Sequence, residues 1–207
     1  MKITWIGHSC FSVEEEGYTV VLDPYENSSV PGLKNVNEKA DLVLCSHEHG
    51  DHNARGNVEL LEGNAPAFEV SWLDTYHDDV KGAKRGPNRI HILKSLKTGK
   101  RLAHLGDLGC PLTEAEAEAL KGLDVLLVPV GGFFTIDYLQ AADIVQTLNP
   151  RIAVPMHFCS DKFGFDVIDK VDRFALTEDK VQECPYSTID TDLDYAARVV
   201  ILTPKNL

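Results

Sequence analysis

Three histidines and an aspartate fall within six consecutive positions of this chain, in the pattern H-x-H-x-D-H formed by His47, His49, Asp51 and His52. Neutral imidazoles and carboxylates are the usual protein ligands of zinc and related divalent metals. One short turn does not wrap a full tetrahedron around a single ion, so the cluster indicates two adjacent metals with further ligands elsewhere. Because bound metal lowers the pKa of water to about 7, the cluster predicts a hydrolase.

The missing ligands are also expected just after strand ends, and His77, Asp107 and His157 are the three candidates. Each also has a purely structural interpretation. His77 could cap a strand end, Asp107 could serve the turn before Gly109, and His157 could be a satisfied core histidine.

The elements that must position these residues alternate between strands and helices. The apolar strand 41–45 leads directly into the histidine cluster, and α/β folds place their chemistry at such strand ends. An opening hairpin pairs 1–6 with 19–22 and turns at 14–17, and a polar loop covers 27–39. A capping box at 113–116 opens a helix that Gly122 ends. The other predicted strands are 89–96, 100–105, 125–130, 151–156 and 197–202, and the other predicted helices are 53–61, 137–148 and 167–175.

Size and composition predict one domain over residues 1–207. No apolar run reaches the roughly 18 residues of a membrane span, and no signal peptide is evident. Five cysteines without a C-x-x-C pair favour a reducing cytoplasm. A net charge of −12 opposes general nucleic-acid binding and leaves a small-molecule substrate as the expected partner. Nothing in the sequence defines an oligomeric state.

Six stretches in fixed order resemble the metallo-β-lactamase-fold hydrolases, in particular the small branch of L-ascorbate-6-phosphate lactonase-like proteins. The stretches are Gly7–Phe11, Leu22–Pro24, the histidine cluster, His77-Asp78, Gly106-Asp107 and Pro155–His157. The resemblance implies a mixed α/β fold, an αββα sandwich of two mixed sheets flanked by helices. It assigns His47, His49 and His77 to one metal, Asp51, His52 and His157 to a second, and Asp107 to both.

The resemblance implies two divalent ions, with Zn²⁺ expected and Mn²⁺ or Fe²⁺ as alternatives. Lactam-cleaving members often carry cysteine where this chain has Asp107, which disfavours a lactamase. Asp23 and Asp78 are expected to orient metal ligands through hydrogen bonds, although Asp23 could be a turn residue before Pro24. Asp51 and His8 are the candidate catalytic residues for protonating a leaving group, with a second water as the alternative.

Three further residues are candidates for contacting substrate. Arg85 lies in the one basic run, 81–89, which could grip an anion or could be a solvated loop pairing with Asp78 and Asp79. Phe133 and Phe134 could wall the pocket or pack in the core. The predicted reaction is attack of a metal-bridging hydroxide on a small anionic ester, lactone or phosphodiester. The alternatives are a nuclease or phosphodiesterase of the same fold, or a metal-binding protein without catalysis.

Overall fold

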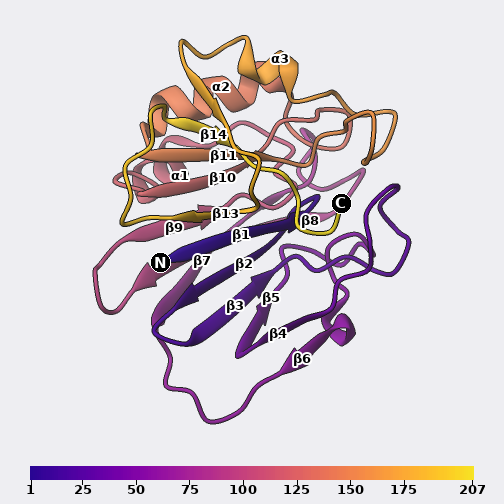
Figure 1. The fold of residues 1–207 in the computed structure, drawn as a ribbon. Helices are drawn as coiled ribbons and strands as arrows, with labels where there is room; N and C mark the ends of the chain where they lie inside the picture. The colour runs from indigo at the N-terminus through magenta and orange to yellow at the C-terminus, as the bar shows by residue number, and fades with distance from the viewer.

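A computed structural model describes all residues 1–207 and shows a sheet-dominated, mixed α/β sandwich (Figure 1). The expected fold is confirmed. The first sheet has five strands in the order β13 (Thr188–Asp190), β1 (Lys2–Gly7), β2 (Cys10–Glu15), β3 (Tyr18–Leu22) and β5 (Leu42–Leu44). The second has seven, in the order β12 (Val181–Glu183), β14 (Val199–Ile201), β11 (Ile152–Met156), β10 (Val125–Pro129), β9 (Arg101–His104), β8 (Pro87–Ser95) and β7 (Phe68–Tyr76).

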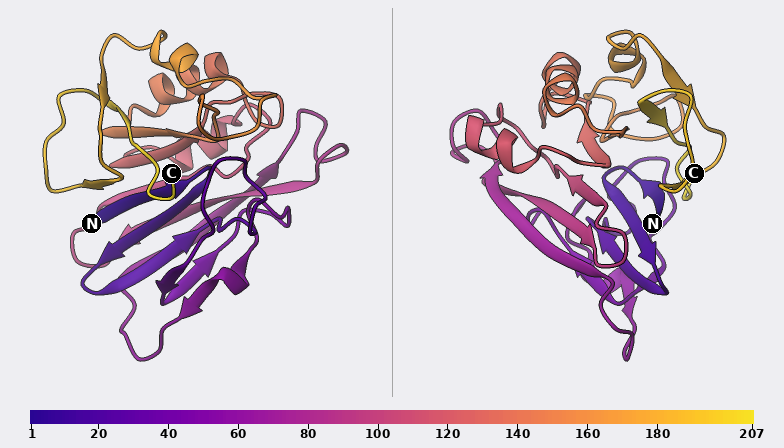
Figure 2. Two further views of the ribbon diagram at one scale, coloured as in Figure 1. Left: turned by 45° about the vertical axis from the view of Figure 1, so that its right-hand side comes forward. Right: turned by 90° about the vertical axis from the view of Figure 1, so that its left-hand side faces the viewer.

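The two sheets lie as layers against one another, as the right-hand view of Figure 2 shows. One continuous apolar core joins them and includes Trp5 and Phe11 of the first sheet and Leu102 and Leu127 of the second. β4 (Glu38–Ala40) and β6 (Val58–Leu60) form a separate parallel pair. The helices are α1 (Glu114–Ala119), α2 (Tyr138–Leu148) and α3 (Asp172–Ala175).

Helices are few and short, and none is long and apolar enough to cross a membrane. The predicted capping box of α1 is present, with Thr113 and Glu116 each accepting from the other's backbone. α2 buries the apolar face expected from its spacing, including Ile144, Val145 and Leu148. Asn149 then ends it in the left-handed conformation.

Three local predictions were wrong. Residues 14 and 15 belong to β2, a strand that the sequence analysis missed, so β1 pairs with β2 and not with β3. Glu15 is buried at the end of β2, opposite Tyr18 of β3. The predicted helix 53–61 is a single 3₁₀ turn at Arg55–Asn57 followed by β6. Only Asp172–Ala175 of the predicted helix 167–175 is helical.

Strand direction gathers the candidate residues at one place. β1, β3 and β5 run the same way in the first sheet, as β7, β9, β10 and β11 do in the second. The loops that follow the carboxyl ends of these strands therefore all emerge at the same edge of their sheet. These segments begin at His8, Asp23, Cys45, His77, Leu105, Val130 and His157.

Candidate metal centre

Six of the seven predicted metal ligands meet at this edge in two groups, and the seventh, Asp107, lies between them. The ring nitrogens of His47, His49 and His77 lie within 4.8 Å of one another. The donor atoms of His8, Asp51, His52 and His157 form a second group of the same span. The first group holds the histidines predicted for one ion, and the second holds the residues predicted for the other together with His8. A third group, Asp23, His47 and His52, overlaps both.

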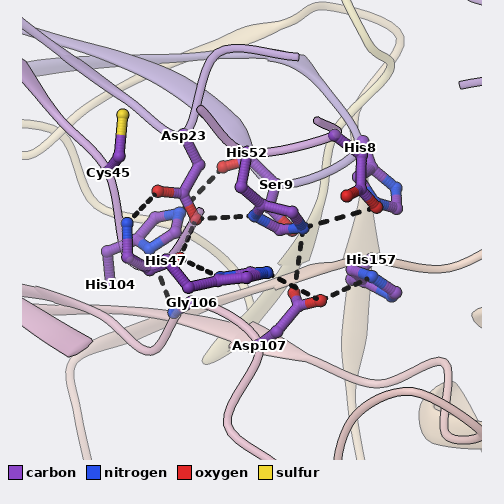
Figure 3. Close-up of polar contacts among 12 residues, drawn as sticks. His8, Ser9, Asp23, Cys45, His47, His52, His104, Gly106, Asp107 and His157 are labelled. Carbon is purple, nitrogen blue, oxygen red and sulfur yellow. Dashed lines mark hydrogen bonds and ion pairs between the residues drawn. The ribbon is translucent and has the colours of Figure 1, made fainter. Parts of the chain in front are cut away.

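Asp107 lies between the two groups. Its Oδ1 is 3.3 Å from His52 Nε2, and its Oδ2 is 3.2 Å from both His77 Nε2 and His157 Nε2. His47 Nε2 is 4.0 Å from Oδ2. Figure 3 shows the carboxylate below the histidine rings, with dashed lines to His47, His52 and His157. One carboxylate therefore touches donors of both groups.

Asp23 fixes the orientation of two of these rings. It accepts a hydrogen bond from His52 Nδ1 at 2.8 Å and from the Ser46 hydroxyl and backbone N–H at 2.6 Å each. Because the Ser46 hydroxyl donates to Asp23, its oxygen accepts from His47 Nδ1, 2.9 Å away. Both imidazoles are thereby protonated on Nδ1 and present an Nε2 lone pair toward Asp107.

These buried lone pairs lack partners. His47 Nε2, His52 Nε2, His157 Nε2 and Asp107 Oδ1 are buried and make no hydrogen bond. A buried ring nitrogen that faces a carboxylate oxygen at 3.2–3.3 Å without a hydrogen bond needs a proton or a metal cation between the two atoms. Nitrogen and oxygen donors in this arrangement suit zinc or a similar divalent ion, so the residues fit the metals that the sequence implies.

Burial favours the neutral form that a metal ligand needs in two of these histidines. Burial and the neighbouring His52 lower the pKa of His47 to about 3, and burial together with His157 lowers that of His8 to about 4. Burial would lower the pKa of His52 as well, but the Asp107 and Asp23 carboxylates outweigh it and raise that pKa well above its ordinary value, so a bound metal ion would displace a proton there. Burial alone would raise the pKa of Asp107, but His157 and His52 outweigh it and hold the pKa well below its ordinary value.

The family of the chain follows from comparison with known proteins. A model described as the beta-lactamase superfamily domain matches residues 2–157. A UPF0173 protein of Pyrococcus furiosus is 32% identical over 183 residues, which cover 76% of this chain and 83% of the relative. This chain belongs to the UPF0173 family of the metallo-β-lactamase superfamily.

The names of two further relatives state a hydrolase activity. A UPF0173 metal-dependent hydrolase of Hyperthermus butylicus is 30% identical over 190 residues, covering 75% of this chain and 82% of the relative. A crystal structure from Thermotoga maritima, described as a Zn-dependent hydrolase of the metallo-β-lactamase superfamily, is 31% identical with a TM-score of 0.76 and 97% coverage of both chains. This UPF0173 protein is a metal-dependent hydrolase.

His8 lies beside the second group of ligands in this UPF0173 hydrolase. Its Nε2 is 3.3 Å from Asp51 Oδ2, and its ring centroid is 4.1 Å from that of His157. The backbone of His8, Asp23 and His157 is left-handed, with φ of 53°, 45° and 53°. Non-glycine residues rarely adopt this conformation, and such strain concentrates at functional sites.

The turn that carries Asp107 depends on Asn88, a residue that the sequence analysis did not single out. The buried Asn88 side chain accepts from the Asp107 backbone N–H at 2.9 Å and donates to Leu105 O and Thr75 Oγ1 at 3.0 and 2.9 Å. Gly106 completes the turn with φ +57°. An asparagine in a strand carries no signal of such a role, so only the fold reveals it. Ser46 escaped notice for the same reason.

Asp78 organises a loop and does not contact His77 through its carboxylate. Its two oxygens accept from four backbone N–H groups, those of Val80, Gly82, Lys84 and Arg85, at 2.8–2.9 Å. Its expected role in orienting a ligand is therefore replaced by bracing of the loop that follows His77. Burial on its own would raise the pKa of Asp78, but the four backbone hydrogen bonds together outweigh it and lower the pKa to about 2.

The three candidate substrate residues lie together near the ligands. The Arg85 guanidinium is 6.0 Å from the Phe133 ring centroid and 5.5 Å from that of Phe134. Phe134 faces His157 at 6.4 Å and Phe165 at 6.1 Å between centroids. Phe133 is 63% exposed, so it does not pack in the core. Phe165, whose ring centroid is 5.5 Å from that of His8, is a further aromatic neighbour of the site that the sequence analysis missed.

Proposed function

We propose that residues 1–207 act as one domain that binds two divalent ions, Zn²⁺ first among them, and hydrolyses a small anionic ester, lactone or phosphodiester. The position of Asp107 supports this most directly. Its carboxylate oxygens lie 3.2–3.3 Å from histidines of both ligand groups. A carboxylate shared in this way suits a pair of ions better than a single one.

In this proposal His47, His49 and His77 hold the first ion, Asp51, His52 and His157 hold the second, and Asp107 contacts both. Bound there, two divalent ions would ionise a water near neutral pH and polarise the acceptor oxygen of the substrate. Two carboxylates leave the loaded centre with a charge of about +2 by simple counting, which favours an anionic substrate within a protein of net charge −12.

The remaining residues position groups and move a proton. Asp23 holds His52 directly and His47 through Ser46, so both rings keep the tautomer that a metal ligand needs. We assign to His8 and Asp51, whose facing atoms are 3.3 Å apart, the relay to the leaving group of the proton that the ionising water would give up. His8, whose pKa burial lowers to about 4, is neutral near pH 7 and can accept that proton. Phe134 and Phe165 beside His157 and His8 limit access of bulk water to that pair.

The narrower resemblance to L-ascorbate-6-phosphate lactonase-like proteins supports lactones as the first substrates to test. A cytoplasmic location remains a prediction from the cysteines, all five of which are free. The acidic composition weighs against nucleic acid as the substrate.

Metal analysis combined with a hydrolase panel tests the proposal. The purified protein is assayed for bound zinc, manganese and iron, and then for turnover of lactones, esters and phosphodiesters before and after removal and return of each metal. We expect about two ions per chain and activity that depends on them. Protein that holds no divalent ion and gains no activity when it is added contradicts the proposal.

A further inference from the structure

A cavity of about 400 Å³ adjoins the first ligand group. It lies beside the carboxyl end of β5 and the start of β8, and His47 and His49 form part of its wall. Three arginines, Arg55, Arg85 and Arg89, line the same space. Its volume is within the range of pockets that hold small ligands. A gathering of guanidinium groups is unexpected in a chain with 20 basic and 32 acidic residues.

Two of the three arginines have no carboxylate partner. Arg89 is neutralised by Asp74 at 2.9 Å. Arg55 uses Nε on the Asn53 side-chain oxygen at 2.9 Å and one terminal nitrogen on Val43 O at 3.1 Å. Glu48, the other acidic group of the cavity, accepts a hydrogen bond from the Asn53 amide. The cavity is lined by three arginines and by two carboxylates, Glu48 and Asp74, so it has one more cation than anions.

Arg85 is the freer of the two unpaired arginines. Its guanidinium forms no ion pair or hydrogen bond, whereas Lys84 beside it pairs with Asp79 at 3.2 Å. Stacking over Phe133 and Phe134 and bracing of its backbone by Asp78 limit the positions that it can take. A guanidinium held in place, with all five N–H donors available, is suited to bind a planar carboxylate or a phosphate.

We infer that this cavity is a subsite for a carboxylate or phosphate on the part of the substrate that does not react. The inference rests on the proposed function and narrows its substrate class to esters and lactones that carry a second, terminal oxyanion. Arg85 and Arg55 bind that oxyanion, while the bond to be cleaved lies at the metal ligands. His47 and His49 border both places, so a small molecule can span them.

The test compares three p-nitrophenyl esters of similar length with the metal-loaded full chain. One is the neutral butyrate, one is the hemiglutarate with a terminal carboxylate, and one is the 4-phosphonobutyrate. The measured quantity is the ratio of kcat/KM for each anionic ester to that for the butyrate. We expect ratios well above one for the native chain and a fall of about 10- to 100-fold in Arg85→Gln, the range for a lost charged hydrogen bond.

Arg198→Gln is the matched control, because Arg198 is exposed, lies far along the chain from the cavity and forms no ion pair. It should leave the ratios as in the native chain. Arg85→Lys should restore part of the ratio, since it returns the charge without the planar fork. A larger ratio for the hemiglutarate or for the phosphonate identifies which oxyanion the subsite prefers.

Equilibrium binding of glutarate and of 4-phosphonobutyrate, followed by calorimetry on the same proteins, separates this inference from the proposed function. Weaker binding in Arg85→Gln than in Arg198→Gln supports the subsite even if no ester is turned over, a result that would count against the proposed reaction alone. Equal binding in all variants, or equal ratios in the kinetic test, overturns the subsite while leaving metal-dependent hydrolysis intact.

Discussion

The Asp23 carboxylate lies 2.8 Å from His52 Nδ1, and this contact decides which nitrogen of His52 faces Asp107. The same carboxylate acts on His47 through the Ser46 hydroxyl, at 2.6 and 2.9 Å. One buried residue between β3 and the following loop therefore controls one ring in each ligand group.

Asp23→Ala and Ser46→Ala should weaken metal binding at different places. Loss of an orienting partner lowers metal affinity by about 10- to 100-fold. We expect Asp23→Ala to weaken the binding of both ions. Ser46→Ala should chiefly weaken the binding of the ion held by His47. Titration with Co²⁺, followed by its absorption spectrum, distinguishes the two. The exposed Asp194→Ala serves as control, and unchanged affinity in Asp23→Ala would show that the tautomer is set elsewhere.

Asp107→Asn should abolish the sharing of one carboxylate between the two ligand groups. The amide keeps the shape and removes the negative charge that balances the ions. We expect fewer than two tightly bound ions per chain and a loss of turnover on the order of 100- to 1,000-fold. Metal analysis and steady-state kinetics measure these effects, and circular dichroism checks the fold. Full activity on a substrate of the native chain would show that Asp107 is not a ligand.

The sequence predicted the fold where local signals agreed with one another. The capping box at Thr113 and the alternation around β10, α2 and β11 lie where expected. Short strands such as β2 and β6 were missed because their partners, and not their own composition, make them strands. Glu15 is an example, since its place in β2 is set by pairing with β3, where it lies opposite Tyr18.

The proximity of the candidate ligands could be predicted because a metal site needs particular side chains at strand ends, and those residue types are visible in sequence. Their neighbours could not. Ser46, Asn88 and Phe165 act through contacts that form only when separate strands meet, and serine, asparagine and phenylalanine are common in many other settings. The role of Asp78 was mistaken for this reason, since its partners are backbone N–H groups.

Asn88→Ala should loosen the turn that carries Asp107. It leaves the Asp107 N–H and Leu105 O without their buried partner, at a cost of about 1–3 kcal/mol in the free energy of unfolding. Urea denaturation measures this effect, and Co²⁺ binding reports whether Asp107 has moved. Asn64→Ala is the control, because Asn64 also donates to a side-chain oxygen, that of Asp41, but at an exposed position. Equal stability of the two variants would contradict this role for Asn88.

Gly106→Ala and Gly17→Ala separate backbone strain from crowding at the site. Both glycines are left-handed, with φ of +57° and +80°, so an added Cβ costs each about 1–2 kcal/mol. At Gly17 that Cβ meets nothing within 4 Å, whereas at Gly106 it lies 2.5 Å from Ser46 Cβ and closer still to the Asn88 side-chain oxygen. We therefore expect Gly106→Ala to lose about 1–3 kcal/mol more of the free energy of unfolding than Gly17→Ala.

Urea denaturation of both variants measures the difference. Only Gly106→Ala should also weaken Co²⁺ binding, because Ser46 and Asn88 hold His47 and Asp107 in place. Equal losses in the two variants would mean that the turn has room to yield and that Gly106 is needed for its backbone conformation alone.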